Sequence, residues 1–220
     1  MNQLKHNKQR ASLAINIIAA VLFFEIAMLI SDFFQYQLIQ TVADGGEITD
    51  AQAESNDNRQ QMLAILYLML YFTSAITFIL WFRRAYYNLH TKINYLNFPE
   101  EWASYAWFTP VLNLFRPFKI MKELFTETNL YLSERSKGFT PKENSTVLTI
   151  WWALWVITGV FGQIIYRMDG ESLDELLTST FLSMVQEMIG IPLALITMKI
   201  IKDYAKLEEQ LYEFKEELPK

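Results

Sequence analysis

Apolar residues along the chain gather in four long blocks that polar segments separate. The blocks cover about 13–32, 62–82, 147–166 and 179–198. An α-helix needs roughly 20 mostly apolar residues to cross a hydrocarbon core about 30 Å thick. Block 62–82 carries no charge and is apolar on every face, unlike the striped helices of soluble proteins. The pattern predicts an all-α polytopic membrane protein with four transmembrane helices in a single domain, 1–220.

The charges between the blocks predict the orientation. All but two of the 19 Lys and Arg residues lie in the N-terminal segment, in 83–146 or in 199–220, and the exceptions are Arg59 and Arg167. Cytoplasmic loops of membrane proteins carry an excess of Lys and Arg. We therefore expect both termini, 83–146 and 199–220 in the cytoplasm, with the two alternate loops on the other side.

Three of the helices are predicted to continue beyond the membrane, the first of them through 33–39. Two others carry apolar residues at alternating spacings of three and four on the cytoplasmic side, as in a heptad seam. These residues are Phe82, Tyr86, Leu89, Ile93 and Leu96, and then Ile200, Tyr204, Leu207, Leu211, Phe214 and Leu218. The seams could pack on each other within the chain, or 199–220 could bind a second copy or a partner protein.

Segment 101–118 is too apolar for an ordinary cytoplasmic loop and too interrupted for a fifth crossing. Pro110 and Pro117 would break a continuous helix, and Asn113 and Arg116 would be costly in lipid. An interfacial or shallow re-entrant hairpin, with Trp and Tyr at headgroup depth and Asn113 capping the turn, accounts for both properties.

An amphipathic helix is predicted to follow over 119–132. Its apolar side would be suited to the membrane surface, with Lys119, Lys122 and Glu123 off that face. The residues of the apolar side are Ile120, Met121, Leu124, Phe125 and Thr128.

This part of the chain resembles a known family. The motif W-x-x-R…N followed by W…P-x-x-N-L-x-x-P is similar to that of the bacterial multi-pass membrane family DUF4328. It is carried by 81–89, Trp102, 107–114, 116–118 and 123–124. The resemblance implies the same topology, in a bacterial plasma membrane, and singles out Arg84, Asn88, Pro110, Asn113 and Pro117. These residues, with Arg116 beside them, would either make turns and anchor the interface or form a ligand or lipid-headgroup site. The family has no known activity.

Two carboxyl groups lie within predicted crossings. Glu25 and Glu187 would sit ~18 Å and ~17 Å from the cytoplasmic face at the helical rise, so they could meet inside the bundle. An ionised acid there would cost about 2.5–3.5 kcal/mol on insertion scales. The pair could form a proton- or cation-handling site, or it could be two protonated, hydrogen-bonded acids that fix helix packing.

Composition excludes several kinds of chemistry. The chain has no cysteine, and His6 and His90 are far apart without partners at ligand spacing, so we expect no catalytic site, cofactor or metal. The net charge of −5 argues against nucleic-acid binding, which needs clustered positive charge.

Three functions remain open. The leading hypothesis is a non-enzymatic bundle that engages a partner or lipid at the cytoplasmic face. One alternative is a small transporter or channel component that uses Glu25 and Glu187. The other is a lipid-modifying membrane enzyme, against which the cytoplasmic face offers no Ser/His, His-cluster or Asp-rich motif.

Overall fold

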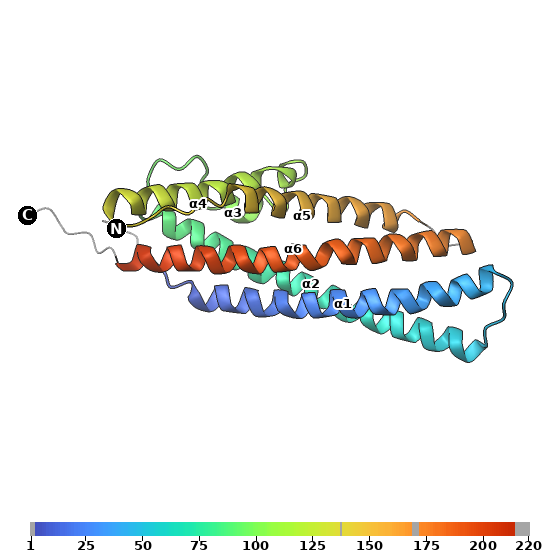
Figure 1. Ribbon diagram of the computed structural model, residues 1–220. Coiled ribbons are helices and arrows are strands. Elements are labelled where there is room, and N and C mark those ends of the chain that lie inside the picture. The colour runs from blue at the N-terminus through green and yellow to red at the C-terminus, as the bar shows by residue number, and fades with distance from the viewer. Residues whose placement is uncertain (1–2, 137, 169–171, 214–220) are drawn as a thin grey trace, which may run out of the picture. The chain divides into compact units, whose positions relative to one another are not determined.

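The computed structural model describes residues 3–136, 138–168 and 172–213, and every regular element in them is a helix (Figure 1). The elements are α1 (Lys8–Ala43), α2 (Asp50–His90), α3 (Trp102–Tyr105), the 3₁₀-helix η1 (Leu112–Leu114), α4 (Arg116–Arg135), α5 (Ser145–Tyr166) and α6 (Leu173–Glu213).

Four of the described helices, α1, α2, α5 and α6, are long and apolar enough to cross a membrane, and each contains one predicted block. The helices α1, α2 and α6 have 36, 41 and 41 residues. At 1.5 Å per residue they are about 54–62 Å long, well beyond a hydrocarbon core. The predicted continuation of these three helices past the apolar blocks is therefore confirmed.

The chain divides into two compact units. Unit 1 comprises 1–16, 75–152 and 197–220, and unit 2 comprises 17–74 and 153–196. Unit 1 thus contains the short elements α3, η1 and α4 with one end of each long helix. Unit 2 contains the remainder of the four long helices.

Unit 1 has an apolar core that the heptad residues help to form. Trp81, Tyr86 and Leu89 of α2 are buried, as is Tyr204 of α6. The Tyr204 ring lies 6.2 Å from that of Trp81 and 5.3 Å from that of Phe125 in α4. These contacts agree with the interpretation that the seams pack within the chain. The α2 seam is shorter than predicted, because α2 ends at His90 before Ile93 and Leu96; Phe214 and Leu218 lie outside the described residues.

Helix α4 has the predicted amphipathic character but not the predicted environment. Its apolar side, which includes Ile120, Met121 and Leu124, is buried against the protein and unavailable to the membrane surface. Glu123, placed off that face from the sequence, is also buried. It accepts a hydrogen bond from the Tyr86 hydroxyl at 2.5 Å and two from Asn97.

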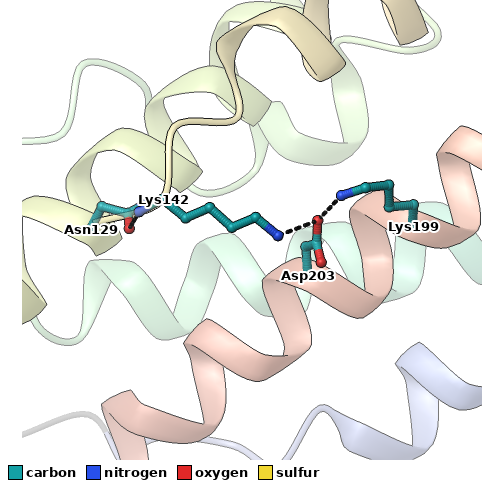
Figure 2. Close-up of polar contacts among 4 residues, drawn as sticks. All are labelled: Asn129, Lys142, Lys199 and Asp203. Atoms are coloured by element: carbon teal, nitrogen blue, oxygen red, sulfur yellow. Dashed lines mark hydrogen bonds and ion pairs between the residues drawn. The ribbon is translucent and has the colours of Figure 1, made fainter. Parts of the chain in front are cut away.

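The connection from α4 to α5 is tied to its surroundings by polar contacts (Figure 2). The Lys142 backbone N–H donates to Asn129 Oδ1 at 3.2 Å. The Lys142 ammonium lies 3.6 Å from the Asp203 carboxylate, which also pairs with Lys199 one turn earlier in α6. Asp203 therefore links the connection to α6.

Unit 2 differs from unit 1 in what it buries. Its described residues bury three apolar side chains, Ile18, Val21 and Ala194, but six polar ones: Glu25, Ser31, Asp32, Asn56, Thr180 and Glu187. Large apolar residues such as Phe23, Met69 and Phe72 are instead exposed. An apolar exterior around polar interior groups is the arrangement expected where lipid is the solvent.

Candidate functional site

The predicted hairpin between α2 and α4 is built around a tight turn at Pro110. The Leu112 N–H donates to the Pro110 carbonyl at 2.8 Å, and Val111 between them has φ 67° and ψ −45°. This geometry is a γ-turn, and a β-branched residue rarely adopts it. The backbone N–H of Asn113 donates to the Thr109 carbonyl at 3.0 Å, which closes the loop and places Asn113 in the turn. Pro117 lies in the first turn of α4, where its missing N–H costs nothing.

Aromatic side chains place this hairpin at the basic-side ends of the predicted crossings. The Trp107 ring lies 5.6 Å from that of Phe78 in α2 and 6.1 Å from that of Trp152 in α5. Trp152 Nε1 donates to the Leu114 carbonyl at 3.0 Å. Phe78 and Trp152 both lie a few residues inside the predicted crossings.

The far side of the hairpin exposes apolar side chains. Phe108 is 74% and Val111 69% exposed, and Tyr105 and Leu114 are also more than half exposed. We call these four residues the hairpin surface. A γ-turn that holds a strained valine outward persists only where the surrounding structure enforces it.

Cationic side chains flank the hairpin surface. The Arg116 guanidinium lies 3.9 Å from the Trp102 ring centre and 5.7 Å from that of Phe98, which holds it by cation–π contact. Lys119 lies 5.2 Å from the Phe115 ring centre, and Lys119 and Lys122 are both exposed. The hairpin and the first turn of α4 thus bring together four of the predicted residues. The two prolines and Asn113 shape the backbone, and Arg116 supplies positive charge.

A cavity of about 410 Å³ lies beside this region, between α4 and the start of α5. Phe125, Leu130 and Leu148 supply apolar lining, Lys122 and Lys142 supply positive charge, and Glu143 supplies negative charge. Asn144, which also lines the cavity, is buried, and its Nδ2 has no hydrogen-bond partner among the described residues. The cavity therefore combines an apolar wall with two cations and one carboxylate, and the Lys142 cation also pairs with Asp203.

Asn88 belongs to a different cluster, which fastens the N-terminal segment. Its side-chain amide accepts a hydrogen bond from Lys5 N at 2.9 Å and donates to Lys5 O at 2.8 Å and to Glu208 Oε1 at 2.6 Å. Asn7 Nδ2 donates to Glu208 Oε2 at 3.0 Å, and the Tyr212 hydroxyl donates to Lys5 O at 2.9 Å.

Glu208 is the charge centre of this Asn88 cluster. It is only 2% exposed, and burial raises its pKa to about 7, although hydrogen bonds from Asn88, Asn7 and Tyr212 and the charge of Arg84 act in the opposite direction. The cluster thus gives a structural role to Asn88, whereas Arg84 acts on it through its charge alone. Sequence reasoning missed Glu208 and Asn7. The available signal was position: Tyr204, Glu208 and Leu211 recur at spacings of four and three, which places Glu208 on the buried stripe of α6.

Unit 2 brings Glu25 and Glu187 into one polar cluster. Glu25 Oε1 accepts a hydrogen bond from the Tyr67 hydroxyl at 2.6 Å. Its carboxyl group lies against the backbone of Gly190 in α6, where an added Cβ would be 2.6–2.8 Å from the carboxyl atoms. Glu187, one turn before Gly190, interacts electrostatically with Glu25 and with Asp32. Glu25 therefore lies against α6 about one helical turn from Glu187.

Asp32 is a third member that the sequence did not single out. Its carboxylate accepts a hydrogen bond from Gln60 Nε2 at 2.8 Å and is electrostatically coupled to Arg59 and Glu187. Asp32 follows Glu25 by seven residues, two helical turns, so both side chains project from one face of α1. That spacing could have identified Asp32 from the sequence. It was not singled out because it lies at the edge of the predicted crossing.

Comparison with known proteins adds a family and no activity. The family model described as "Domain of unknown function (DUF4328)" matches residues 44–206. No curated protein and no solved structure matches the chain. The matched range contains the hairpin, α4, Asn88 and Glu187, whereas Glu25, Asp32 and Glu208 lie outside it.

Proposed function

The chain belongs to the family of the domain of unknown function DUF4328, and we propose that this member is a non-enzymatic membrane protein whose unit 1 binds anionic lipid headgroups. In this proposal the four long helices cross a bacterial plasma membrane with both termini in the cytoplasm. The bound lipids belong to the cytoplasmic leaflet. A protein partner at the same face, including a second copy through 199–220, is the rival occupant.

The hairpin surface is the observation that carries the proposal. Phe108 and Val111 present apolar side chains to the outside at the level of Trp107 and Trp152. Amphipathic and aromatic side chains at this depth bury themselves at the boundary between headgroups and acyl chains. Water would be a poor solvent for such a surface, whereas the bilayer interface stabilises it.

Charge complementarity favours a lipid over a neutral or cationic partner. Lys119 and Lys122 are exposed on α4, which follows the hairpin in sequence, and Arg116 is held in place over Trp102. Each Lys or Arg close to an anionic membrane surface contributes about 1 kcal/mol of attraction. These cations and the apolar hairpin surface match the two ends of an anionic lipid.

The cavity beside α4 gives the headgroup a defined place. Lys122 lines it, together with Lys142, whose ammonium also pairs with Asp203, and the buried Asn144 amide is a further donor. The lysine ammonium binds phosphate as a point charge and donates hydrogen bonds to its oxygens. The apolar lining from Phe125 and Leu148 suits the glycerol and the first carbons of the chains.

The two histidines have structural contacts outside the cavity. The His6 ring lies 5.4 Å from that of Tyr212, and His90 Nε2 lies 2.9 Å from the Phe98 carbonyl oxygen. Neither is in the cavity, which is lined by no histidine or cysteine. The described residues that line the cavity are suited to bind a headgroup through its charge and shape.

The proposal is tested with the full chain in detergent, titrated with phosphatidylglycerol or phosphatidylcholine and followed by native mass spectrometry. Replacing Lys119 and Lys122 by Gln removes two cations and about 2 kcal/mol of attraction, so phosphatidylglycerol should bind about 30-fold more weakly. Phosphatidylcholine binding should change little. The matched control, Lys202→Gln with Lys206→Gln, removes the same charge from exposed sites on α6.

Equal losses in the test and control pairs would show that only net charge matters, and the site would be wrong. Loss of a copurifying protein, without any change in lipid binding, would favour the rival occupant.

A further inference from the structure

Glu187 is buried among other acids rather than among bases. It is 5% exposed, and neither of its carboxylate oxygens has a hydrogen-bond partner in good geometry within the described residues. Its electrostatic neighbours on α1 are Asp32 and Glu25. A buried charge normally has an oppositely charged or donor partner, so an ionised Glu187 here would be unusually unfavourable.

The neighbouring helices supply little positive charge. From α2, Tyr67 and Tyr71 face Glu25, and Arg59 faces Asp32. Arg59 is itself engaged, with its Nε donating to Ser31 Oγ at 2.9 Å and an Nη donating to Asn56 Oδ1 at 2.6 Å. The described part of α5 has one titratable residue, Tyr166, which is 85% exposed at its end. Among the described residues, three acids therefore face one arginine. Protonation is the simplest way to neutralise the negative charge that Arg59 does not balance.

Hydrogen-bonded polar residues lead away from this cluster toward one end of unit 2. Gln60 contacts Asp32, and beyond it Arg59, Asn56, Gln35 and Thr180 are joined by hydrogen bonds of 2.6–3.3 Å toward the α1–α2 connection, 44–49. On the opposite side of Glu25 within unit 2, the buried described residues are Ile18, Val21 and Ala194, all apolar. Polar side chains can conduct protons to the cluster from the first side, and the apolar layer opposes conduction on the second.

We propose that Glu25, Asp32 and Glu187 form a proton-binding site inside the membrane-spanning bundle, open to the side of the α1–α2 connection. Protons reach it past Arg59 and Gln60, and a proton shared between Glu187 and Asp32 converts two repelling carboxylates into a hydrogen-bonded pair. Tyr67 donates to Glu25 and bounds the cluster at its deeper end. The inference depends on the helices crossing a membrane but not on lipid binding by unit 1.

The full chain in sealed vesicles of ether-linked lipid, which has no ester carbonyl, tests this site by infrared difference spectroscopy. Raising the pH on the side of 44–49 should remove a C=O band of protonated carboxyl groups. Raising it on the opposite side should leave the band unchanged over the same time. Glu187→Gln should lose part of the band, and Asp32→Asn provides a second variant if the first does not fold by circular dichroism.

The matched control is Glu54→Gln, an exposed acid near the start of α2, which should keep the wild-type band. A band that is identical in wild type and both folded cluster variants would overturn the proposal. So would equal access from both sides.

Discussion

Gly190 shows how a single atom can decide the shape of the acidic cluster. The space that a Cβ would occupy is taken by the carboxyl group of Glu25, which Tyr67 holds by a 2.6 Å hydrogen bond. Elsewhere a glycine inside a helix is destabilising relative to alanine by roughly 0.5–1 kcal/mol. Here the glycine allows two helices to meet with an acid between them.

Gly190→Ala should therefore destabilise the protein, because the new methyl group would push Glu25 away from Tyr67. We expect a loss of about 1–3 kcal/mol, as for other overpacked sites, measured as a lower midpoint of thermal unfolding in detergent. Gly159→Ala in α5 is the control, since its Cβ would meet nothing within 4 Å. It should be neutral or stabilising. Similar midpoints for the two variants would show that the Glu25 contact is absent.

At the scale of elements, the Asn88 cluster joins three segments that are distant in sequence. The N-terminal segment before α1, the end of α2 and the end of α6 meet on Asn88, whose amide satisfies both the N–H and the carbonyl of Lys5. A buried amide that replaces a backbone pairing partner in this way fastens a segment that has no helix of its own. The buried Glu208 makes that fastening sensitive to pH.

The folded protein should hold the N-terminal segment more tightly at low pH. Because burial raises the pKa of Glu208 to about 7, the folded state retains a proton that the unfolded state has already released. Its stabilising contribution is complete below the unfolded pKa and is lost as the pH rises through about 7, by at most about 3 kcal/mol. Amide hydrogen exchange of residues 3–7 in wild type, relative to Glu208→Gln at each pH, measures this loss. A ratio that stays constant with pH would contradict it.

At the scale of the whole molecule, the four long apolar helices and the charge distribution lead to one proposed topology. Because the chain has no cysteine, single introduced cysteines can report the side of each segment without background. Glu47→Cys in the α1–α2 connection should react with an impermeant maleimide in intact cells. Lys202→Cys on α6 should react only after lysis, and the reverse pattern would invert the proposed orientation. Both positions are exposed in the structure.

Much of the fold was readable from the sequence because lipid-crossing helices need long apolar runs, and such runs have few alternative structures. The four blocks, the helical continuations and the amphipathic pattern of α4 were all predictable in this way. The environment of α4 was not, because an apolar helix face looks the same whether it covers lipid or protein. Only the positions of Tyr204 and Tyr86 beside α4 establish that protein covers it.

The sequence by itself determined that the chain has four membrane-length helices, a basic side and acids within two of the apolar blocks. Tertiary structure alone decided which polar groups meet: Glu187 with Asp32, Glu25 with the backbone of Gly190, and Asn88 with Glu208 and Lys5. The physical reason is the range over which each interaction acts along the chain. Burial in lipid acts on each helix separately and leaves a local pattern, whereas a hydrogen bond between helices depends on rotation and register that no local pattern encodes.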